Sequence, residues 1–498
     1  MRKCNTMIHM KKLLTIFLAI TLFSCSGPQE GTDYSAGVRD IPDLAGKKVS
    51  VLSGSLDDLV ATELRPEAEV LRLSSIAEVL AAVSTGQADY CLTDTLALIG
   101  LNLEEKGLMY LFSSDVVAGD LGFGFRFGEE ELCAEFNGFL SGFKADGRWD
   151  ELNTRWTKGD VAGVTMPEIK LNPDGETLRV GIINNFPFSF IQNGKYAGFE
   201  IELIELFAAQ TGRNVEYQMI DFAGIIAALQ TGKIDIISST LTITEERRKQ
   251  ILFSDPYYYC NTSCCCRLVS QGSEAKSVIT KVKESFHNNL IVEDRWKIVL
   301  KGLWETLVIS FLSILLGSML GAFICWMKLS GSKALKSIAG VYVDIMRGVP
   351  ILVLLMLMFY VIFSNSGVSA RWVAIIAFAM NFGAYVSEMF RTGIEGVDKG
   401  QTEAGLAMGF SPLRTFCLFV VPQALRKVIP VFKGEAVSLI KNTSVVGFIA
   451  IQDLTKASEI IRARTFDAFF PLIVITILYF ILAWLLGKGL DALAKKIA

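Results

Sequence analysis

Apolar and polar residues follow different patterns in the two halves of the chain. Between residues 178 and 268, apolar runs typical of buried strands alternate with helical patterns, at 178–183, 199–210, 225–229 and 234–238. The same rhythm occurs earlier, at 49–52, 76–83 and 88–92. Alternating strands and helices predict a parallel α/β lobe in each segment. Two lobes with a cleft between them commonly enclose a small polar ligand, so we expect a two-lobed binding domain.

From residue 296 onward, long apolar runs dominate the chain. Four of them carry no charge, at 306–327, 349–363, 372–387 and 469–486. A weaker run at 430–451 contains Lys433, Glu435 and Lys441. Such runs are typical of transmembrane helices, and ionisable residues at membrane depth usually face other helices or a water-filled path. The sequence therefore predicts an all-α domain of five transmembrane helices, in which the weaker span faces the interior.

Basic residues gather on one side of these five spans. They follow the first, third and fifth spans, and they are Lys328, Lys333, Lys336, Arg391, Lys399, Arg414, Arg426, Lys427, Lys488, Lys495 and Lys496. By the positive-inside rule this side is the cytoplasm. We therefore expect a multi-pass protein of a bacterial cytoplasmic (inner) membrane, with the binding domain on the extracytoplasmic side.

Residues 1–25 have the pattern of an export signal. Lys11 and Lys12 precede the apolar run 13–23, which is too short to span a bilayer. The run leads to Leu22-Phe23-Ser24-Cys25, which resembles the bacterial lipoprotein box, in which the cysteine is lipidated. We expect a lipoprotein-type signal peptide with Cys25 as the lipidation site. An ordinary cleaved signal is the alternative.

The composition argues against several classes of function. The 48 Lys and Arg residues are balanced by 51 Asp and Glu, whereas a nucleic-acid-binding protein normally has a basic surplus. Only two histidines occur, His9 and His287, which disfavours histidine-based zinc sites and Ser-His-Asp catalysis. We therefore expect no nucleic-acid partner, no metal, no cofactor and no catalytic residues.

Three of the ten cysteines are consecutive, at 264–266. This spacing suits neither a metal site nor a regular disulfide framework. We expect a buried strand of small residues there, and a redox or disulfide role is the alternative.

The loop after the third span carries the most specific motif. Residues 400–409 read Gly-Gln-Thr-Glu-Ala-Gly-Leu-Ala-Met-Gly, and an apolar stretch with Pro422 follows. This resembles the EAA loop of ABC importer permeases, with matches at Glu403, Ala404, Gly409 and Pro422, while Gly405 replaces the third small residue. The segments 344–350, 384–388 and 439–444 resemble the polar amino-acid branch of that family. The resemblance implies a homodimer whose Glu403, Ala404 and Gly409 contact a separate ATP-binding subunit.

No Gly-x-x-x-x-Gly-Lys-Ser/Thr motif for ATP phosphates occurs in the sequence. ATP hydrolysis is therefore expected on the separate subunit, and we expect this chain to be a transporter subunit rather than an enzyme.

The exported half resembles the periplasmic amino-acid-binding proteins, the glutamine-binding kind in particular. The likeness rests on the segments 186–188, 198–201, 221–235 and 240–247 for a first lobe and on 49–94 for a second lobe. It implies that an amino-acid ligand is bound by Arg247, Asp94, Thr240, Thr242, Phe186, Phe222, Ser53 and Ser55. Arg247 would hold the ligand carboxylate, because its guanidinium offers paired donors.

The other residues have corresponding implied roles. Asp94 would pair with the ligand ammonium, Thr240 and Thr242 would add donors, and Phe186 and Phe222 would sandwich the aliphatic part. The Ser53-Gly54-Ser55 turn would meet the carboxylate. The structural alternatives are a solvated helix-start charge for Arg247, a core residue for Phe222 and a helix cap for Asp94.

The order of the lobes differs from that of the family. The second lobe and its C-terminal tail occupy 38–160, and the first lobe, which the family places first, occupies 178–268. We interpret this as a circular permutation in which 161–177 joins the old ends, because domain termini often lie close together. Two eroded tandem domains are the alternative. A linker at 270–295 would lead to the permease domain at 296–495.

These observations predict a substrate-binding and permease subunit of an ATP-driven amino-acid importer. No acidic residue lies near Phe186 to meet a cationic side chain, which favours a neutral polar ligand such as glutamine. The alternative is a ligand-gated channel or receptor that uses the same two lobes, although all five spans follow both lobes and no Thr-Val-Gly-Tyr-Gly filter occurs. An exported enzyme is disfavoured because no nucleophile, base and orienting group cluster in the sequence.

Overall fold

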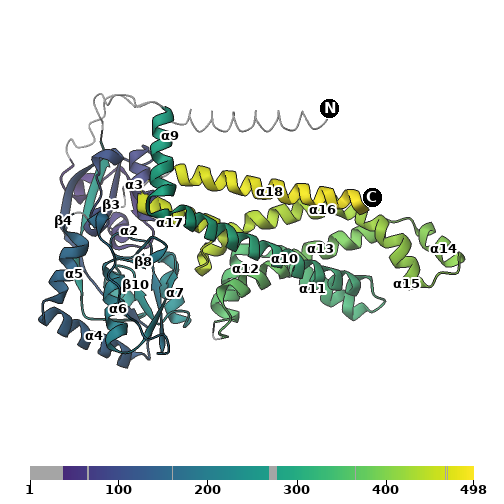
Figure 1. Ribbon diagram of the computed structural model, residues 1–498, viewed down its shortest axis with the longest axis horizontal. Helices are drawn as coiled ribbons and strands as arrows, with labels where there is room; N and C mark the ends of the chain where they lie inside the picture. The colour runs from purple at the N-terminus through teal and green to yellow at the C-terminus, as the bar shows by residue number, and fades with distance from the viewer. Residues whose placement is uncertain are drawn as a thin grey trace.

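An α/β half and an all-helical half lie end to end in the computed structural model (Figure 1). The structure describes residues 38–63, 67–159, 161–268, 278–364, 366–465, 467 and 469–497. The expected signal peptide, Cys25 included, lies outside these residues. The two-lobed α/β fold followed by a helical membrane domain is the predicted fold class.

The second lobe contains a five-stranded sheet in the order β2-β1-β3-β12-β4. Its strands are β1 (Lys48–Leu52), β2 (Glu69–Leu73), β3 (Tyr90–Asp94), β4 (Leu108–Leu121) and β12 (Tyr258–Arg267). The first three are parallel, and β12 runs antiparallel between β3 and β4. The helices are α2 (Leu56–Glu63) and α3 (Ile76–Ser84), with the short turns η1 (Ile41–Leu44), η2 (Thr95–Leu98) and η3 (Glu104–Lys106). Cys264, Cys265 and Cys266 are buried in β12, which confirms the predicted strand.

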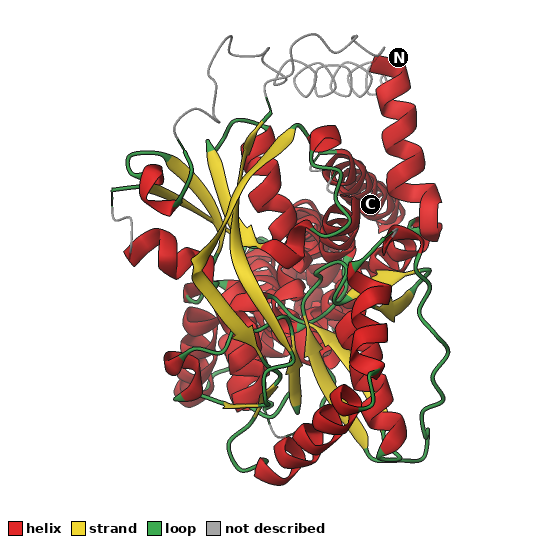
Figure 2. Cartoon of the chain, turned by 90° about the vertical axis from the view of Figure 1, so that its left-hand side faces the viewer, coloured by secondary structure: helices red, strands yellow, loops and turns green. Residues whose placement is uncertain are grey.

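The first lobe contains a second five-stranded sheet in the order β11-β5-β10-β6-β9. Its strands are β5 (Gly124–Phe125), β6 (Thr177–Ile182), β9 (Asn214–Met219), β10 (Ile236–Ser238) and β11 (Leu252–Phe253), beside the hairpin β7 (Phe190–Gln192) and β8 (Lys195–Ala197). The helices are α4 (Glu130–Ala145), α5 (Arg148–Thr157), α6 (Phe199–Gln210), α7 (Ile225–Gln230) and α8 (Glu245–Arg248), with turns η4 (Val161–Gly163) and η5 (Phe222–Gly224). Figure 2 shows the strands of the α/β half with helices around them.

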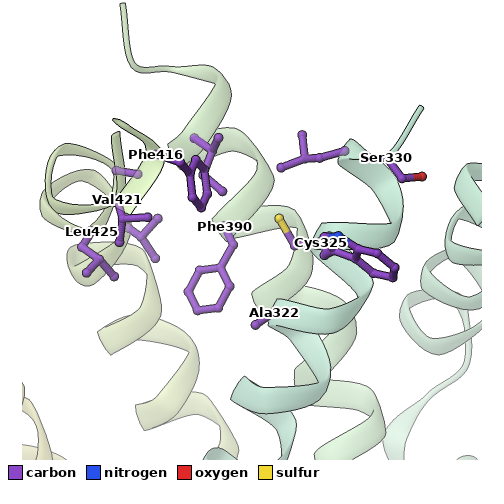
Figure 3. A pocket seen from close by; sticks show the side chains of 12 residues that line it. Ala322, Cys325, Ser330, Phe390, Phe416, Val421 and Leu425 are labelled. Atoms are coloured by element: carbon purple, nitrogen blue, oxygen red, sulfur yellow. The ribbon is translucent and has the colours of Figure 1, made fainter. Parts of the chain in front are cut away.

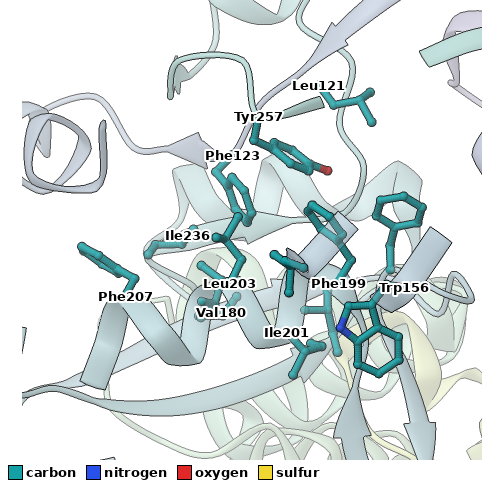
Figure 4. Packing of buried hydrophobic residues seen from close by; sticks show 14 of the residues in the cluster. Leu121, Phe123, Trp156, Val180, Phe199, Ile201, Leu203, Phe207, Ile236 and Tyr257 are labelled. Carbon is teal, nitrogen blue, oxygen red and sulfur yellow. The ribbon is translucent and has the colours of Figure 1, made fainter. Parts of the chain in front are cut away.

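The two lobes share chain segments. Strand β5 follows β4 of the second lobe in sequence but pairs with β10 and β11 of the first lobe. Strand β12 follows the first lobe but pairs with β3 and β4 of the second. Helices α4 and α5 also pack on the first lobe, where Phe136 meets Phe207 with ring centroids 5.1 Å apart and Trp156 is buried (Figure 4). Each lobe therefore contains a strand that comes from the part of the chain forming the other lobe.

The helical half begins with a structured connection. The expected linker at 270–295 is helical where it is described, with α9 (Val278–Phe286), η6 (His287–Ile291) and η7 (Val292–Asp294). The remaining elements are α10 (Trp296–Leu329), α11 (Lys333–Gly348), α12 (Ile351–Leu357), η8 (Met358–Ile362), α13 (Ala370–Glu395), α14 (Lys399–Ala407), α15 (Pro412–Thr415), η9 (Phe416–Val420), α16 (Val421–Asn442), η10 (Thr443–Ile449), α17 (Leu454–Thr465) and α18 (Phe470–Ile497).

Four helical segments among the described residues are long and apolar enough to cross a membrane. They are Trp296–Leu329, Ala370–Glu395, Pro412–Ile449 and Phe470–Ala492. The predicted span at 349–363 is the exception, because Lys333–Gly348 and Ile351–Ile362 meet at a bend of 106° and make a fifth span only if they are taken together. The difference arises at Pro350, which stands at the break between the two helices and disfavours a helical conformation at the preceding residue.

Helix α13 has the most buried apolar window of the four long helices among the described residues. In α13, 61% of the most apolar window is buried, compared with 22% in the segment from Pro412 to Ile449. Glycines allow the close contact of α13 with α10, since a Cβ at Gly317 would lie 2.8 Å from the carbonyl oxygen of Ala379. The span with Lys433 and Glu435 also packs inside the chain, because Ala436, Leu439 and Ile440 are buried and Lys433 pairs with Asp491 of α18 (2.8 Å). That this span faces the interior of the membrane domain stays a prediction.

Candidate functional site

Arg247 connects the two lobes of the binding domain. Its Nη1 donates a hydrogen bond to the Thr242 carbonyl (2.8 Å), and its Nη2 donates one to the carbonyl of Gly54 in the second lobe (2.9 Å). Thr244 caps the short helix α8 on which Arg247 lies, by accepting from its backbone N–H (3.3 Å). Burial lowers the pKa of Arg247, and nearby Asp94 opposes that shift. Arg247 is thus a half-buried residue between the lobes rather than a solvated charge.

Asp94 is the last residue of β3 in the second lobe and lies near Arg247. It stands at the position before η2, but its side chain makes no capping hydrogen bond, so the helix-cap alternative does not apply. Burial and the neighbouring Asp57 raise the pKa of Asp94 well above its usual range, while the charge of Arg247 lowers it. A buried carboxylate near a single guanidinium gains from a further cation, which is what a ligand ammonium offers.

Asp57 is a second buried carboxylate beside this position. Its Oδ1 accepts a hydrogen bond from the Thr262 hydroxyl (2.6 Å), and Thr262 lies opposite Asp94 in the pairing of β12 with β3. Burial raises the pKa of Asp57 to about 6. Asp57 was not among the residues predicted from the sequence, although only Leu56 separates the Asp57-Asp58 pair from the Ser53-Gly54-Ser55 turn.

The two aromatic residues lie in different surroundings. Phe222 is half-buried, packs against core residues of both lobes and has the Arg247 guanidinium 5.4 Å from its ring centroid. Phe186 is buried among the first-lobe aromatics, 4.9 Å from Phe190. The guanidinium of Arg464, from α17 of the helical half, covers the ring of Phe186 at 4.1 Å. Phe222 therefore borders the cleft next to Arg247, whereas Phe186 contacts α17.

The threonines are held inside the first lobe. The Thr240 backbone N–H donates to Glu200 Oε1 (2.7 Å), and its hydroxyl accepts from Asn185 Nδ2 (3.1 Å). Glu200 also accepts from the hydroxyls of Tyr257 and Ser238, and burial raises its pKa to about 7. Thr240 has φ = 48°, a conformation that L-residues rarely adopt, so this buried carboxylate helps to fix the turn.

The serine turn is built around Asp58. Gly54 N–H donates to Asp58 Oδ2 (3.0 Å), and Ser55 Oγ accepts from the Asp58 N–H (3.2 Å) at the start of α2. The backbone N–H of Ser53 donates to the Leu73 carbonyl (2.9 Å). These bonds place the Gly54 carbonyl where Arg247 reaches it, so the turn and Arg247 meet in the structure.

The EAA-like loop lies at the end of the helical half that points away from the binding domain (Figure 1). Glu403, Ala404 and Gly409 are exposed, and Gly409 has φ = 83° in the turn that ends α14. Gly405 is buried, and a Cβ at this position would come within 2.5 Å of Thr415 Cγ2. The departure from the family pattern at Gly405 therefore has a packing reason.

Two of the cavities in or next to the helical half differ in the character of their lining. One of about 480 Å³ opens between α10, α13 and α16 and is lined mostly by apolar side chains such as Trp326, Phe390 and Leu425 (Figure 3). The other, of about 710 Å³, lies between the first lobe and the helices and includes Tyr196, Glu305 and Arg371. The polar cavity suits a zwitterion better than the apolar one does. No group of three or more metal-ligating side chains occurs among the described residues.

Helix α17 is the element that the sequence analysis missed. It lies on the binding-domain side of the helical half and carries the basic residues Lys456, Arg462 and Arg464. Lys456 pairs with Asp221 of the first lobe, and Arg462 pairs with Glu78 of the second lobe (3.1 Å). Three basic residues in a loop that the positive-inside rule assigns to the extracytoplasmic side were the available signal.

Known proteins resemble the chain in two ways, as a family of binding proteins and as permeases. The family model of bacterial extracellular solute-binding proteins, family 3, matches residues 178–408. The match begins within β6 of the first lobe, and it continues beyond the binding domain into the helical half, ending just after α14.

The relatives with the most similar sequences are permeases. A protein of Rickettsia bellii (strain RML369-C) named as the glutamine transport system permease GlnP is 31% identical over 201 residues, which are 40% of this chain and 92% of that protein. The L-cystine transport system permease protein TcyB of Bacillus subtilis (strain 168) is 33% identical over 211 residues, 42% of this chain and 90% of that protein. A solved amino acid ABC transporter with histidines is 30% identical, covers 45% of this chain and all of its own, and has a TM-score of 0.38.

Proposed function

This chain belongs to the amino-acid ABC transporter permeases, and we propose that it captures and translocates a neutral polar amino acid such as glutamine. A solute-binding domain is fused to its permease. Its partner is a separate ATP-binding subunit, and the working unit is a homodimer. The binding domain lies on the extracytoplasmic side of a bacterial inner membrane. The observation that carries the proposal is that Arg247 of the first lobe donates to the Gly54 carbonyl of the second lobe and lies close enough to Asp94 for its charge to lower the pKa of that carboxyl group.

In this proposal Arg247 holds the ligand carboxylate and Asp94 the ammonium. In the structure Arg247 donates to two carbonyl oxygens, one of them from the opposite lobe. A carboxylate is a stronger acceptor than a carbonyl for a guanidinium, so a ligand exchanges a neutral acceptor for a charged one. Because this exchange takes place between the lobes, ligand binding and lobe closure are one event.

Four hydroxyl residues hold the turns on either side of Arg247 and Asp94: Ser53, Ser55, Thr240 and Thr242. Ser55 starts the helix after the turn, and Thr242 supplies the carbonyl that orients Arg247. Phe222 offers the apolar surface next to the guanidinium. Phe186 contacts α17, where the guanidinium of Arg464 covers its ring.

The amino acid then passes from the cleft to the helices. The polar cavity between the first lobe and the helical half contains the ion pair of Arg371 with Glu305 (2.5 Å), which gives a charged lining to the entry. ATP binding and hydrolysis act from the other end, through Glu403, Ala404 and Gly409. The exposed apolar side chains of Leu406, Met408 and Leu413 next to this motif support a protein partner there.

The test is equilibrium binding of the twenty amino acids to the full chain in lipid nanodiscs. We expect Arg247→Met to weaken binding at least about 100-fold, because the variant loses a charge-assisted pair in a half-buried site. Arg148→Met is the control, since Arg148 pairs with Asp146 on the surface of α5. Retained affinity in Arg247→Met, or tight binding of a sugar or nucleobase in place of every amino acid, refutes the proposal.

The coupling role has its own test. Glu403→Arg places a cation in the exposed motif, and we expect it to abolish ligand-stimulated ATP hydrolysis in the reconstituted complex while amino-acid affinity stays unchanged. If ligand-stimulated hydrolysis persists, the ATP-binding subunit docks elsewhere.

A further inference from the structure

Helix α17 of the permease half contacts both lobes of the binding domain. Its residue Ile460 is buried in the aromatic core of the first lobe, and the carbonyl of Ile460 accepts a hydrogen bond from Asn184 Nδ2 (3.2 Å). On the opposite side Arg462 contacts Glu78 of α3, and the Thr465 carbonyl accepts from Lys106 Nζ (2.5 Å). Both lobes therefore touch one helix that belongs to the transporter.

A cavity of about 50 Å³ lies where the two lobes and α17 meet. Its lining comes from three parts of the chain, with Leu52 and Ser75 from the second lobe, Asn184 and Phe222 from the first lobe, and Lys456 and Glu459 from α17. A water molecule occupies about 30 Å³ of liquid, so a cavity of this size takes a group of a few heavy atoms.

This cavity adjoins the candidate ligand site. Phe222 lines it and also lies 5.4 Å from the guanidinium of Arg247. Leu52 lines it too, and the turn that follows Leu52 supplies the Gly54 carbonyl bound by Arg247. A ligand whose α-carboxylate is held by Arg247 can therefore extend its side chain along Phe222 into the cavity.

We propose that Lys456 and Glu459 of α17 form the wall that contacts the end of the ligand side chain, so that the permease half helps to select the amino acid. This inference rests on the proposed function, because it assigns the side-chain end of the same ligand site. It goes further in making ligand choice a property of the fused chain rather than of the binding domain by itself.

The wall is rigid because α17 is fixed from the membrane side. Asp453 Oδ1 accepts from the Lys456 backbone N–H (2.9 Å), and Asp453 Oδ2 accepts from the Tyr479 hydroxyl (3.0 Å). A Cβ at Gly302 of α10 would lie 2.6 Å from the Asp453 carbonyl oxygen, so the two backbones are in close contact. Residues held in this way present their charged groups at fixed positions, which selectivity requires.

The charges of the wall favour particular side chains. The Lys456 ammonium pairs with Asp221 and with Glu459 (2.8 Å), so two carboxylates surround one cation. The wall thus has one more negative charge than positive, and this net negative charge repels an anionic side-chain end. An amide has no net charge and offers hydrogen-bond donors to the carboxylates. The wall therefore selects glutamine over glutamate.

The experiment ranks the twenty amino acids by competition against the tightest-binding labelled amino acid, on the full chain in nanodiscs. In Glu459→Gln, we expect the affinity of glutamate relative to glutamine to rise about threefold to tenfold, the range of a partly exposed charge pair. In Lys456→Met, we expect the same ratio to fall, because the two carboxylates lose their cation. The matched control is Lys433→Met, whose lysine also pairs with an aspartate, Asp491 (2.8 Å), but on α16.

The outcomes distinguish amino-acid binding by the chain from ligand selection by α17. If the wild-type chain binds no amino acid, the proposed function is wrong. If amino acids bind and the ranking is the same in wild type, Glu459→Gln and Lys456→Met, the function stands and the role of α17 is refuted. A change of equal size in Lys433→Met also refutes it, because the effect then does not come from the cavity wall.

Discussion

The two lobes of the binding domain are attached to the membrane half very differently. Side chains of the first lobe contact three separate segments of the helical half: Asn184, Phe186 and Asp221 contact α17, Tyr196 accepts from Gln452 (3.0 Å), and Lys233 donates to the Phe363 carbonyl (2.5 Å). The second lobe contacts the end of α17 through Glu78 and Lys106. A lobe with many attachments is held in place, so movement in the cleft falls to the second lobe.

The cores of the lobes differ in the same direction. The first lobe is packed with large aromatic side chains, among them Phe123, Phe136 and Tyr257, with ring centroids 4.7 Å apart in two of the pairs. The second lobe has a smaller core of Val, Leu and Cys residues around β1 and β3. Buried area scales with side-chain size, so the first lobe is the more stable platform and the second is the lobe that opens more readily.

The largest effect is expected from removing an aromatic side chain that joins chain segments. Phe136→Ala empties the contact of α4 with α6 and is expected to lower the free energy of unfolding of the first lobe by about 4 kcal/mol. Val79→Ala in the second lobe removes two methyl groups and is expected to cost about 2 kcal/mol there. Hydrogen exchange of the full chain measures both, because it resolves the lobes separately. Equal losses in the two lobes would contradict the difference between the cores.

The second prediction concerns how the stability of each lobe depends on pH, because each lobe contains a buried carboxyl group. Asp57 has its pKa raised from 3.8 to about 6, and Glu200 has its pKa raised from 4.5 to about 7, in both cases by burial. A folded-state pKa above the unfolded value means that the folded form binds the proton more tightly. The resulting stability is complete below the unfolded pKa and is lost as the pH rises through the folded pKa.

We therefore expect the second lobe to lose about 2 kcal/mol between pH 4 and 6.5, and the first lobe to lose a similar amount up to about pH 7.5. Asp57→Asn is expected to reduce the pH dependence of the second lobe, to leave the part that comes from Asp94, and to leave the dependence of the first lobe unchanged. The measurement is the opening free energy from hydrogen exchange at each pH, corrected for intrinsic rates. A pH dependence of the second lobe as large in Asp57→Asn as in the wild type would assign it to another group.

The smallest effect is expected at the attachment of the second lobe. Glu78→Gln breaks the ion pair with Arg462, whose side chain is only 10% exposed. Burial raises the pKa of Glu78, but the bonds from Ser74 and Arg462 outweigh this and leave the pKa below its usual value, so the pair is ionised at neutral pH. We expect the variant to increase exchange in α3 and β1 by about fivefold, or about 1 kcal/mol.

Asp221→Asn in the first lobe is the control for Glu78→Gln in the second lobe. Asp221→Asn removes one of the attachments of that lobe, and Lys456 keeps its bond to Glu459 (2.8 Å). We expect little change in the exchange of β6 in this variant. A larger opening of the first lobe than of the second would show that the attachments are not what distinguishes them.

Much of the fold follows from local sequence patterns. The α/β lobes, the charge-free runs of α10, α13 and α18, and the buried cysteine strand were predictable, because burial of strands and lipid exposure of helices both leave long apolar runs in the sequence. The bend at Pro350 and the interior position of α13 were not predictable in the same way. They depend on which helices pack together, and a uniformly apolar helix does not record its neighbours.

For the candidate site, the sequence by itself determined which residue types were available: a guanidinium at Arg247, a carboxylate at Asp94 and an aromatic ring at Phe222. Only the tertiary structure decided that Gly54, 193 residues before Arg247, accepts its hydrogen bond, and that Lys456 and Glu459 of a membrane domain line a small cavity beside Phe222. The physical reason is the range of each interaction. Propensity, charge and apolar periodicity act between neighbours in sequence, whereas a cleft is formed by segments that meet only when the whole chain has folded.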